Sequence, residues 1–200
     1  MIKLIYFDIG GVIVTDGFWR AAPLFAKKLK LDEQKLIKAY KKTKQPEYSM
    51  GTLDGTTRWT NFFKQLNITI DNVEEYIELW HSAYQLIPET IILILKLKKK
   101  YRIGCLSDQP LDLIPHLESF GIFELFDPRV VSCEIGHSKS ELNYTIFEIA
   151  KEKAKLDYNE ILYIDDRQDH LDRAKELGYN VLLFTDAHKL EKDLIEMKLL

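Results

Sequence analysis

Residues 2–11 of this 200-residue chain read IKLIYFDIGG, and this stretch decides the fold. Five of the six residues before Asp8 are apolar or aromatic, which is typical of a strand buried on both faces of a sheet. Gly10 and Gly11 then favour a turn in which the backbone approaches a ligand closely. Because ligands bind at the carboxyl edge of open α/β sheets, Asp8 is a candidate site residue. An Asp at a strand end is also a common turn former, and this stretch alone leaves both roles open.

The composition indicates a globular protein without an electrostatic footprint for nucleic acid. Hydrophobic residues make up 46% and charged residues 30%, and the formal charge is −3 with a pI near 6.0. Cys105 and Cys133 both fall in predicted buried strands, which favours a reducing compartment and no cysteine metal site. The longest apolar run, residues 91–95, is too short for a bilayer, and the N-terminus lacks a signal-peptide pattern. We expect a cytoplasmic monomer or homodimer that binds neither membranes nor nucleic acid.

Between residues 16 and 86 the pattern predicts helices only. Asp16, Asp32 and Asp54 are candidate helix N-caps, and Asp71 with Glu74 has the spacing of a capping box. Residues 45–47, Gln-Pro-Glu, should break a helix. All three tryptophans lie in this segment, Trp19 on an apolar stripe over residues 18–29, and we interpret the aromatic side chains as core of a helical bundle.

After Pro88 strands and helices alternate, which predicts a doubly wound α/β fold with a parallel sheet. The expected further strands are residues 102–106, 129–133, 161–164 and 181–184. The expected helices are residues 88–100, 111–120, 142–153, 171–177 and one from about 188. The sequence thus predicts a five-stranded core domain, residues 1–15 and 87–200, with an all-helical cap domain, residues 16–86, inserted after the first strand.

Polar side chains follow the other predicted strands too. The second ends in Ser107-Asp108-Gln109 and the fourth in Asp165-Asp166, and Lys139 lies in the loop after the third. Each alone suits a turn, but together they meet at one sheet edge. Adjacent carboxylates are costly unless a cation lies between them and Asp8, and Mg²⁺ takes such oxygen ligands. A hydroxyl and a lysine then complete a site for a phosphoryl group.

The order Asp…Ser…Lys…Asp-Asp resembles the haloacid dehalogenase (HAD) superfamily, in which a helical C1 cap is inserted where this chain has residues 16–86. Receiver domains also combine an acid pair with an Asp and a Lys, but the acid pair comes first there. Residues 7–13, FDIGGVI, are similar to a subgroup that includes bacterial α-glucose-1-phosphate phosphatases and relatives of the N-terminal domain of soluble epoxide hydrolase.

The resemblance implies a Mg²⁺-dependent phosphatase that acts on a small phosphate ester, such as a sugar phosphate, through an aspartyl-phosphate. It implies that Asp8 is the nucleophile and that Ser107 and Lys139 are the other catalytic residues. The implied substrate-binding residues are Gly11, Ser107, Asp108 and Lys139. The implied metal ligands are Asp8, the carbonyl of Gly10, Asp165 and Asp166, with Asp166 the better candidate for direct contact and Asp169 in support.

This chain departs from the family pattern at two positions. Most family phosphatases have a second Asp, the general acid, where this chain has Gly10, and a Pro after the lysine where it has Ser140. Asp16 and His137 are the nearest substitutes for the missing acid, but we expect Asp16 to cap a helix, His137 to be a solvated loop residue, and neither to be essential. Without the acid, leaving groups of low pKa should be favoured. The alternatives are a weakly active or non-catalytic relative that binds a phosphorylated ligand or a protein partner, and a dehalogenase, which Gly10 and the acid pair disfavour.

Overall fold

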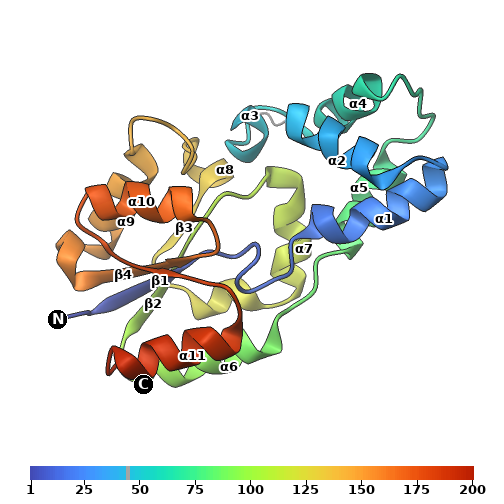
Figure 1. Cartoon of the computed structure of the whole chain (residues 1–200). Coiled ribbons are helices and arrows are strands. Elements are labelled where there is room, and N and C mark those ends of the chain that lie inside the picture. Colours follow the sequence, from blue (N-terminus) through green and yellow to red (C-terminus); the bar gives the residue numbers. More distant parts are fainter. Residues whose placement is uncertain (44–45) are drawn as a thin grey trace.

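The computed structural model describes residues 1–43 and 46–200 and has a five-stranded parallel sheet at its centre (Figure 1). The strand order is β3-β2-β1-β4-β5. The strands are β1 (Leu4–Phe7), β2 (Arg102–Ser107), β3 (Arg129–Val131), β4 (Ile161–Asp165) and β5 (Asn180–Leu183). The predicted doubly wound α/β core is confirmed.

The central position of β1 places Asp8 between the ends of its two neighbours. Phe7 pairs with Cys105 of β2 on one side and with Ile164 of β4 on the other. The chain therefore reaches Ser107 and Asp165 at the same edge of the sheet as Asp8. Parallel pairing alone brings these three side chains together, because all the strands end on the same side.

Helices cover both faces of the sheet, as Figure 1 shows. On one face, α6 (Pro88–Leu97) and α11 (Ala187–Glu196) pack with Ile5 and Phe7 of β1. On the other, α9 (Thr145–Ala154) and α10 (Gln168–Glu176) pack with Leu4 and Tyr6. The alternation of apolar side chains along β1 thus fills two separate cores, as a strand buried on both faces requires.

Short helical segments connect these elements. They are η1 (Leu111–Leu113), α7 (Ile114–Ser119), η2 (Ile122–Leu125), α8 (Ser132–Ile135) and η3 (Tyr158–Glu160). The helix expected over residues 111–120 is therefore a 3₁₀ turn that continues into α7. None of the helices in residues 1–43 and 46–200 combines the length and the apolar sequence needed to cross a membrane.

The inserted segment forms a helical group beside the carboxyl edge of the sheet (Figure 1). Its helices are α1 (Gly17–Leu29), α2 (Glu33–Lys42), α3 (Pro46–Ser49), α4 (Gly55–Gln65) and α5 (Glu74–Ser82). The carboxylates of Asp16, Asp32 and Asp54 accept backbone N–H bonds at the starts of α1, α2 and α4, which confirms the three expected caps. These bonds satisfy donors that the first turn of a helix leaves unpaired.

The two connections between the core and the insertion pair with each other. Val14 and Leu86 form an antiparallel bridge, the Thr15 N–H donates to the Gln85 carbonyl, and the Ile87 N–H donates to the Ile13 carbonyl. A paired double crossing at residues 13–15 and 85–87 supports the boundaries expected from the sequence. We therefore infer that residues 16–86 form a cap domain on a core of residues 1–15 and 87–200.

Some local expectations are wrong. The Asp71-Glu74 capping box does not form, because α5 begins at Glu74 without a side-chain cap and Asn72 accepts the Glu75 N–H instead. Strand β3 ends at Val131, so Cys133 lies in α8 and is partly exposed, whereas Cys105 is buried in β2 as expected.

Trp19 is 45% exposed rather than part of the bundle core, because it follows the buried Phe18 by one residue and therefore points about 100° away from it around the helix. The other two tryptophans, Trp59 and Trp80, are buried as expected. The helix break expected at residues 45–47 lies partly outside the described residues, which omit 44 and 45. Among the described residues, α2 ends at Lys42 and α3 begins at Pro46.

Candidate active site

Asp8 is 6% exposed, and the chain holds both of its carboxylate oxygens. The Ser107 hydroxyl donates to Asp8 Oδ1 at 2.6 Å, and the backbone N–H of Ile9 donates to the same oxygen at 2.8 Å. The Lys139 ammonium lies 3.1 Å from Asp8 Oδ2. These three contacts orient the carboxylate at the end of β1.

Lys139 is shared between two carboxylates. Its ammonium lies 2.7 Å from Asp165 Oδ2 and 3.1 Å from Asp8 Oδ2, and only 1% of its side chain is exposed. Tyr163 and His170 also contact Asp165 Oδ2, and the Arg167 N–H donates to Asp165 Oδ1. Burial opposes ionisation of Asp165, but Lys139 and His170 outweigh it and hold its pKa far below the usual value.

The pKa of Asp8 moves in the opposite direction. Burial raises it to about 7, and Lys139 only partly offsets this because Asp165 and Asp166 add negative charge. Burial and the neighbouring Asp165 raise the pKa of Asp166 to about 6. The single positive charge of Lys139 thus does not neutralise three adjacent carboxyl groups. It lies closer to Asp165 than to Asp8, so it lowers the pKa of Asp165 the most.

These three carboxyl groups have the geometry of a cation site. Asp8, Asp165 and Asp166 each offer an oxygen, and the three oxygens lie within 4.8 Å of one another. The Asp166 carboxylate lines a cavity, whereas the oxygens of Asp165 are already engaged by the chain's own donors. Oxygen ligands with excess negative charge fit a hard divalent cation such as Mg²⁺.

Gly11 lies against this cluster and must be glycine. A Cβ atom there would lie 2.3 Å from Asp166 Oδ2, and its φ of 76° is in the left-handed region. Gly11 therefore allows the turn after β1 to approach the Asp166 carboxylate closely. The adjacent Gly10 lines the cavity, as its expected role as a carbonyl ligand requires.

Asp108 holds the loop that carries Lys139. Its Oδ1 accepts the Lys139 N–H at 3.0 Å, and its Oδ2 accepts the Ser138 hydroxyl at 2.9 Å. The Ser140 N–H then donates to Ser138 Oγ at 3.1 Å, a bond that a proline at position 140 could not make. The bond requires a backbone N–H at position 140, which every residue except proline supplies.

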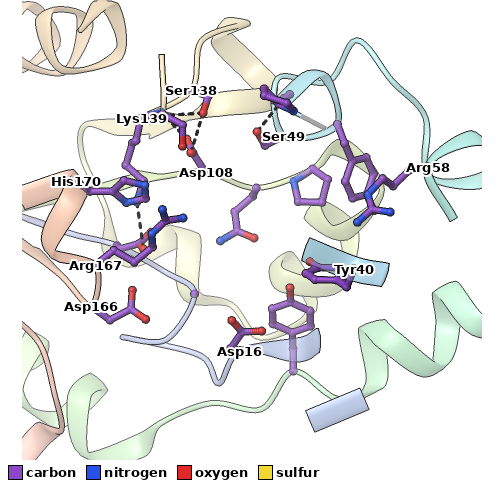
Figure 2. A pocket seen from close by; sticks show the side chains of 18 of the residues that line it. Asp16, Tyr40, Ser49, Arg58, Asp108, Ser138, Lys139, Asp166, Arg167 and His170 are labelled. Atoms are coloured by element: carbon purple, nitrogen blue, oxygen red, sulfur yellow. Dashed lines mark hydrogen bonds and ion pairs between the residues drawn. The ribbon is translucent and has the colours of Figure 1, made fainter. Parts of the chain in front are cut away.

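A cavity of about 390 Å³ lies between this sheet edge and the cap (Figure 2). Asp8, Gly10, Lys139 and Asp166 line it from the core. Asp16, Tyr40, Tyr48, Arg58, Trp80 and Tyr84 line it from the cap. Its volume is in the range of small-molecule sites.

Three further residues singled out in the sequence, Asp16, His137 and Asp169, lie in different surroundings. Asp16 caps α1 as expected and also borders the cavity, and burial raises its pKa. His137 is partly buried and pairs with Glu141 at 3.2 Å, so it is not simply solvated. Asp169 forms an ion pair with Arg167 at 2.6 Å with 59% of its side chain exposed, so it is a surface residue rather than a support of the acid cluster.

The sequence analysis missed several residues of the site. Gln109 donates from Nε2 to Ser107 Oγ at 3.0 Å, and His170 contacts Asp165 from α10. Tyr40 and Arg58 reach the cavity from α2 and α4. The position of Gln109, two residues after Ser107 at the end of β2, could have indicated its role. For Tyr40 and Arg58 the sequence carries no signal that shows which way a cap side chain points.

Solved structures share this fold at low sequence identity. A HAD family enzyme from Bacteroides thetaiotaomicron, in complex with magnesium and inorganic phosphate, is 20% identical with a TM-score of 0.67, covering 92% of this chain and 95% of its own. The putative HAD-hydrolase YfnB from Bacillus subtilis, bound to magnesium, is 15% identical with a TM-score of 0.75, covering 98% and 99%. The L-2-haloacid dehalogenase from Xanthobacter autotrophicus, with chloropropionic acid covalently bound, is 15% identical with a TM-score of 0.68, covering 100% and 85%.

Comparison with curated proteins gives no significant match. The family model described as haloacid dehalogenase-like hydrolase matches residues 2–178, which include β1, the whole insertion and every motif residue of the sheet edge. The chain therefore belongs to the haloacid dehalogenase-like hydrolases, and it is an enzyme of that family.

Proposed function

We propose that this hydrolase is a Mg²⁺-dependent phosphatase of a small phosphorylated metabolite. The observation that carries the proposal is the cluster of Asp8, Asp165 and Asp166 beside the buried Lys139, at the core wall of a cavity of small-molecule size. The phosphate and magnesium bound to the Bacteroides enzyme, which shares the fold, support the same chemistry.

Asp8 is the proposed nucleophile. One of its oxygens attacks phosphorus, the ester P–O bond breaks, and the chain carries an aspartyl-phosphate that water then hydrolyses. Ser107 and the Ile9 N–H hold the carboxylate in place, so little reorganisation is needed before attack. The backbone at Gly11 is close enough to the acid cluster to contact a phosphoryl group there, as its expected substrate-binding role requires.

Lys139 is proposed to bind the phosphoryl oxygens and the nucleophile together. Asp165 and Asp8 outweigh its burial and raise its pKa above the usual lysine value, so it stays charged. Asp108 is proposed to act by positioning Lys139 through the loop bonds described above. This arrangement keeps a fixed cation at the site where negative charge accumulates during transfer.

The acid cluster is proposed to hold Mg²⁺ with Asp8, Asp166 and the Gly10 carbonyl as ligands and Asp165 nearby. The Asp166 carboxylate, which lines the cavity, is a better candidate for direct contact than Asp165, whose oxygens already accept bonds from Lys139, His170 and the backbone. When bound, the ion neutralises charge on the carboxylates and the phosphoryl group.

The test is turnover of p-nitrophenyl phosphate with Mg²⁺ or with EDTA, by the wild-type protein and by the Asp8→Asn variant. An amide cannot form the phosphoryl-enzyme, so we expect turnover to fall by at least about 10³-fold while the fold stays intact by circular dichroism. Asp169→Asn is the matched control, since that side chain is exposed, and it should retain most of its activity.

Near wild-type turnover by Asp8→Asn would show that Asp8 is not the nucleophile. Absence of wild-type turnover with retained phosphate binding would instead favour the non-catalytic alternative, and release of halide from a haloacid would favour dehalogenation.

A further inference from the structure

Arg58 is a buried cation of the cap that lines the catalytic cavity. It lies on α4 and is 3% exposed, and no other charged side chain of the described cap residues is buried. Figure 2 shows it across the cavity from Lys139, Asp166 and Arg167. A charge this deeply buried is costly unless something compensates it.

The described residues compensate it only in part. Arg58 Nη1 donates to Thr43 Oγ1 at 3.0 Å, and the Thr43 hydroxyl also bonds to the Ala39 carbonyl. The guanidinium group carries five N–H donors, and Thr43 is the one hydrogen-bond partner it has within residues 1–43 and 46–200. No carboxylate of those residues forms an ion pair with it: Asp16 caps α1, and Asp112 accepts the Tyr48 hydroxyl.

Aromatic rings surround the guanidinium group instead. Its carbon lies 5.0 Å from the ring centre of Tyr40, 5.7 Å from Trp59 and 5.9 Å from Tyr48. Such rings stabilise a cation by their π-faces while they keep water away. These contacts leave the N–H donors that Thr43 does not use available to a ligand in the cavity, and the low dielectric of a buried site strengthens any ion pair formed there.

Tyr40 adds a second donor at the same place. It borders the cavity beside Arg58 (Figure 2), and burial raises its pKa to about 12, so the hydroxyl stays protonated. A guanidinium group and a phenol on one wall favour an acceptor with negative charge, such as a carboxylate or a phosphate.

We propose that Arg58 and Tyr40 form a second anion site, which binds a carboxylate or phosphate group at the end of the substrate remote from the transferred phosphoryl group. This inference rests on the proposed phosphatase function, because the phosphoryl group occupies the sheet edge at Asp8 and Lys139. The substrate class is then a small phosphate ester with a second anionic group, short enough to lie within the cavity between β1 and α4.

The experiment compares ligands that differ only in that group. Phosphonates with a terminal carboxylate, in a series of increasing chain length, are titrated by calorimetry into the Mg²⁺-loaded protein against the matching primary amides, which have the same shape but no charge. We expect the best carboxylate to bind at least about tenfold more tightly than its amide, since a bond to a charged group contributes that much.

Variants then assign the preference to the residue. Arg58→Gln should bind acid and amide equally, and Arg58→Lys should keep part of the preference because it retains the charge but not the fork. Arg20→Gln is the matched control, since Arg20 lies on the exposed surface of the cap and bonds to Gln85. Arg20→Gln should keep the wild-type ratio.

Equal binding of acid and amide by the wild-type protein would overturn the inference without any variant, and so would an undiminished preference in Arg58→Gln. If Arg58 were purely structural, Arg58→Gln would lower the stability of the protein and weaken the binding of acid and amide by the same factor. Turnover of p-nitrophenyl phosphate separates the two proposals: turnover without a charge preference removes the anion site alone, and an Arg58-dependent preference without turnover removes the phosphatase function alone.

Discussion

Gly10 and Gly11 are adjacent, but only one of them must be glycine. A Cβ at Gly11 would collide with Asp166, whereas a Cβ at Gly10 would lie 3.4 Å from Gln109 Nε2, an ordinary contact. Gly10 also lacks the positive φ of Gly11. A Cβ atom therefore fits at the position where most family phosphatases have their general acid, and neither sterics at the Cβ nor the backbone requires glycine there.

The rate should consequently depend on the leaving group. Without a proton donor at position 10, a leaving alkoxide of high pKa departs unprotonated, and loss of such a donor typically costs roughly 10²–10⁴-fold. Across a series of aryl and alkyl phosphates, we expect log kcat to fall steeply as the pKa of the leaving group rises. Steady-state kinetics with Mg²⁺ measure this slope.

The Gly10→Asp variant is the complementary test. It restores a carboxyl group at that position, so its slope should be shallower, with the gain concentrated in alkyl phosphates. A flat wild-type series would show that another group donates the proton. Asp16→Asn and His137→Gln would then separate the two candidates, of which Asp16 alone lines the cavity.

At the scale of elements, the carboxylate of one core residue, Asp112, contacts three cap helices. Asp112, in η1, accepts the Tyr48 hydroxyl of α3 at 2.9 Å and lies 3.6 Å from His81 Nε2 of α5. Gly55, at the start of α4, approaches so closely that a Cβ there would lie 2.4 Å from Asp112 Oδ2. We therefore expect this contact to limit how closely α4 approaches the core beside the cavity.

Gly55→Ala should therefore destabilise the wild-type protein by about 1–3 kcal/mol, since α4 must move away from Asp112. In the Asp112→Ala background the same change should be neutral or stabilising, because the obstructing carboxylate is absent and alanine favours a helix by up to about 1 kcal/mol over glycine. Chemical denaturation of the four proteins of this double-mutant cycle measures the coupling. Equal effects in both backgrounds would show that the contact does not set the position of α4.

At the scale of the molecule, the acid cluster stores repulsion that a cation relieves. Asp8, Asp165 and Asp166 come from the ends of two strands, so folding itself brings their charges together. Mg²⁺ binds the assembled cluster but not the dispersed carboxylates of the unfolded chain. The native state should therefore gain stability by mass action.

We expect millimolar Mg²⁺ to raise Tm by about 5–10 °C over EDTA if it is present at about a hundred times its Kd. The Asp166→Asn variant should lose most of this shift, while Asp169→Asn should keep it. Differential scanning calorimetry makes the comparison. An unchanged Tm in the wild-type protein would count against the proposed metal site.

The sequence by itself determined the order of the elements and the residues of the sheet edge. Parallel strands end on one side of a sheet, so the ends of the strands at Asp8, Ser107 and Asp165 had to meet once the α/β alternation was recognised. The caps at Asp16, Asp32 and Asp54 were predictable as well, because a cap involves only neighbouring residues.

Only the tertiary structure decided which cap residues face the site. Helical periodicity marks Tyr40 and Arg58 as positions on α2 and α4, but the direction in which they point depends on how those helices pack on one another and on Asp112. It also decided that Cys133 leaves the sheet, that Trp19 is exposed and that Asp169 turns to Arg167. The directions of Tyr40 and Arg58 depend on contacts between residues far apart in the chain, and local propensities do not contain that information.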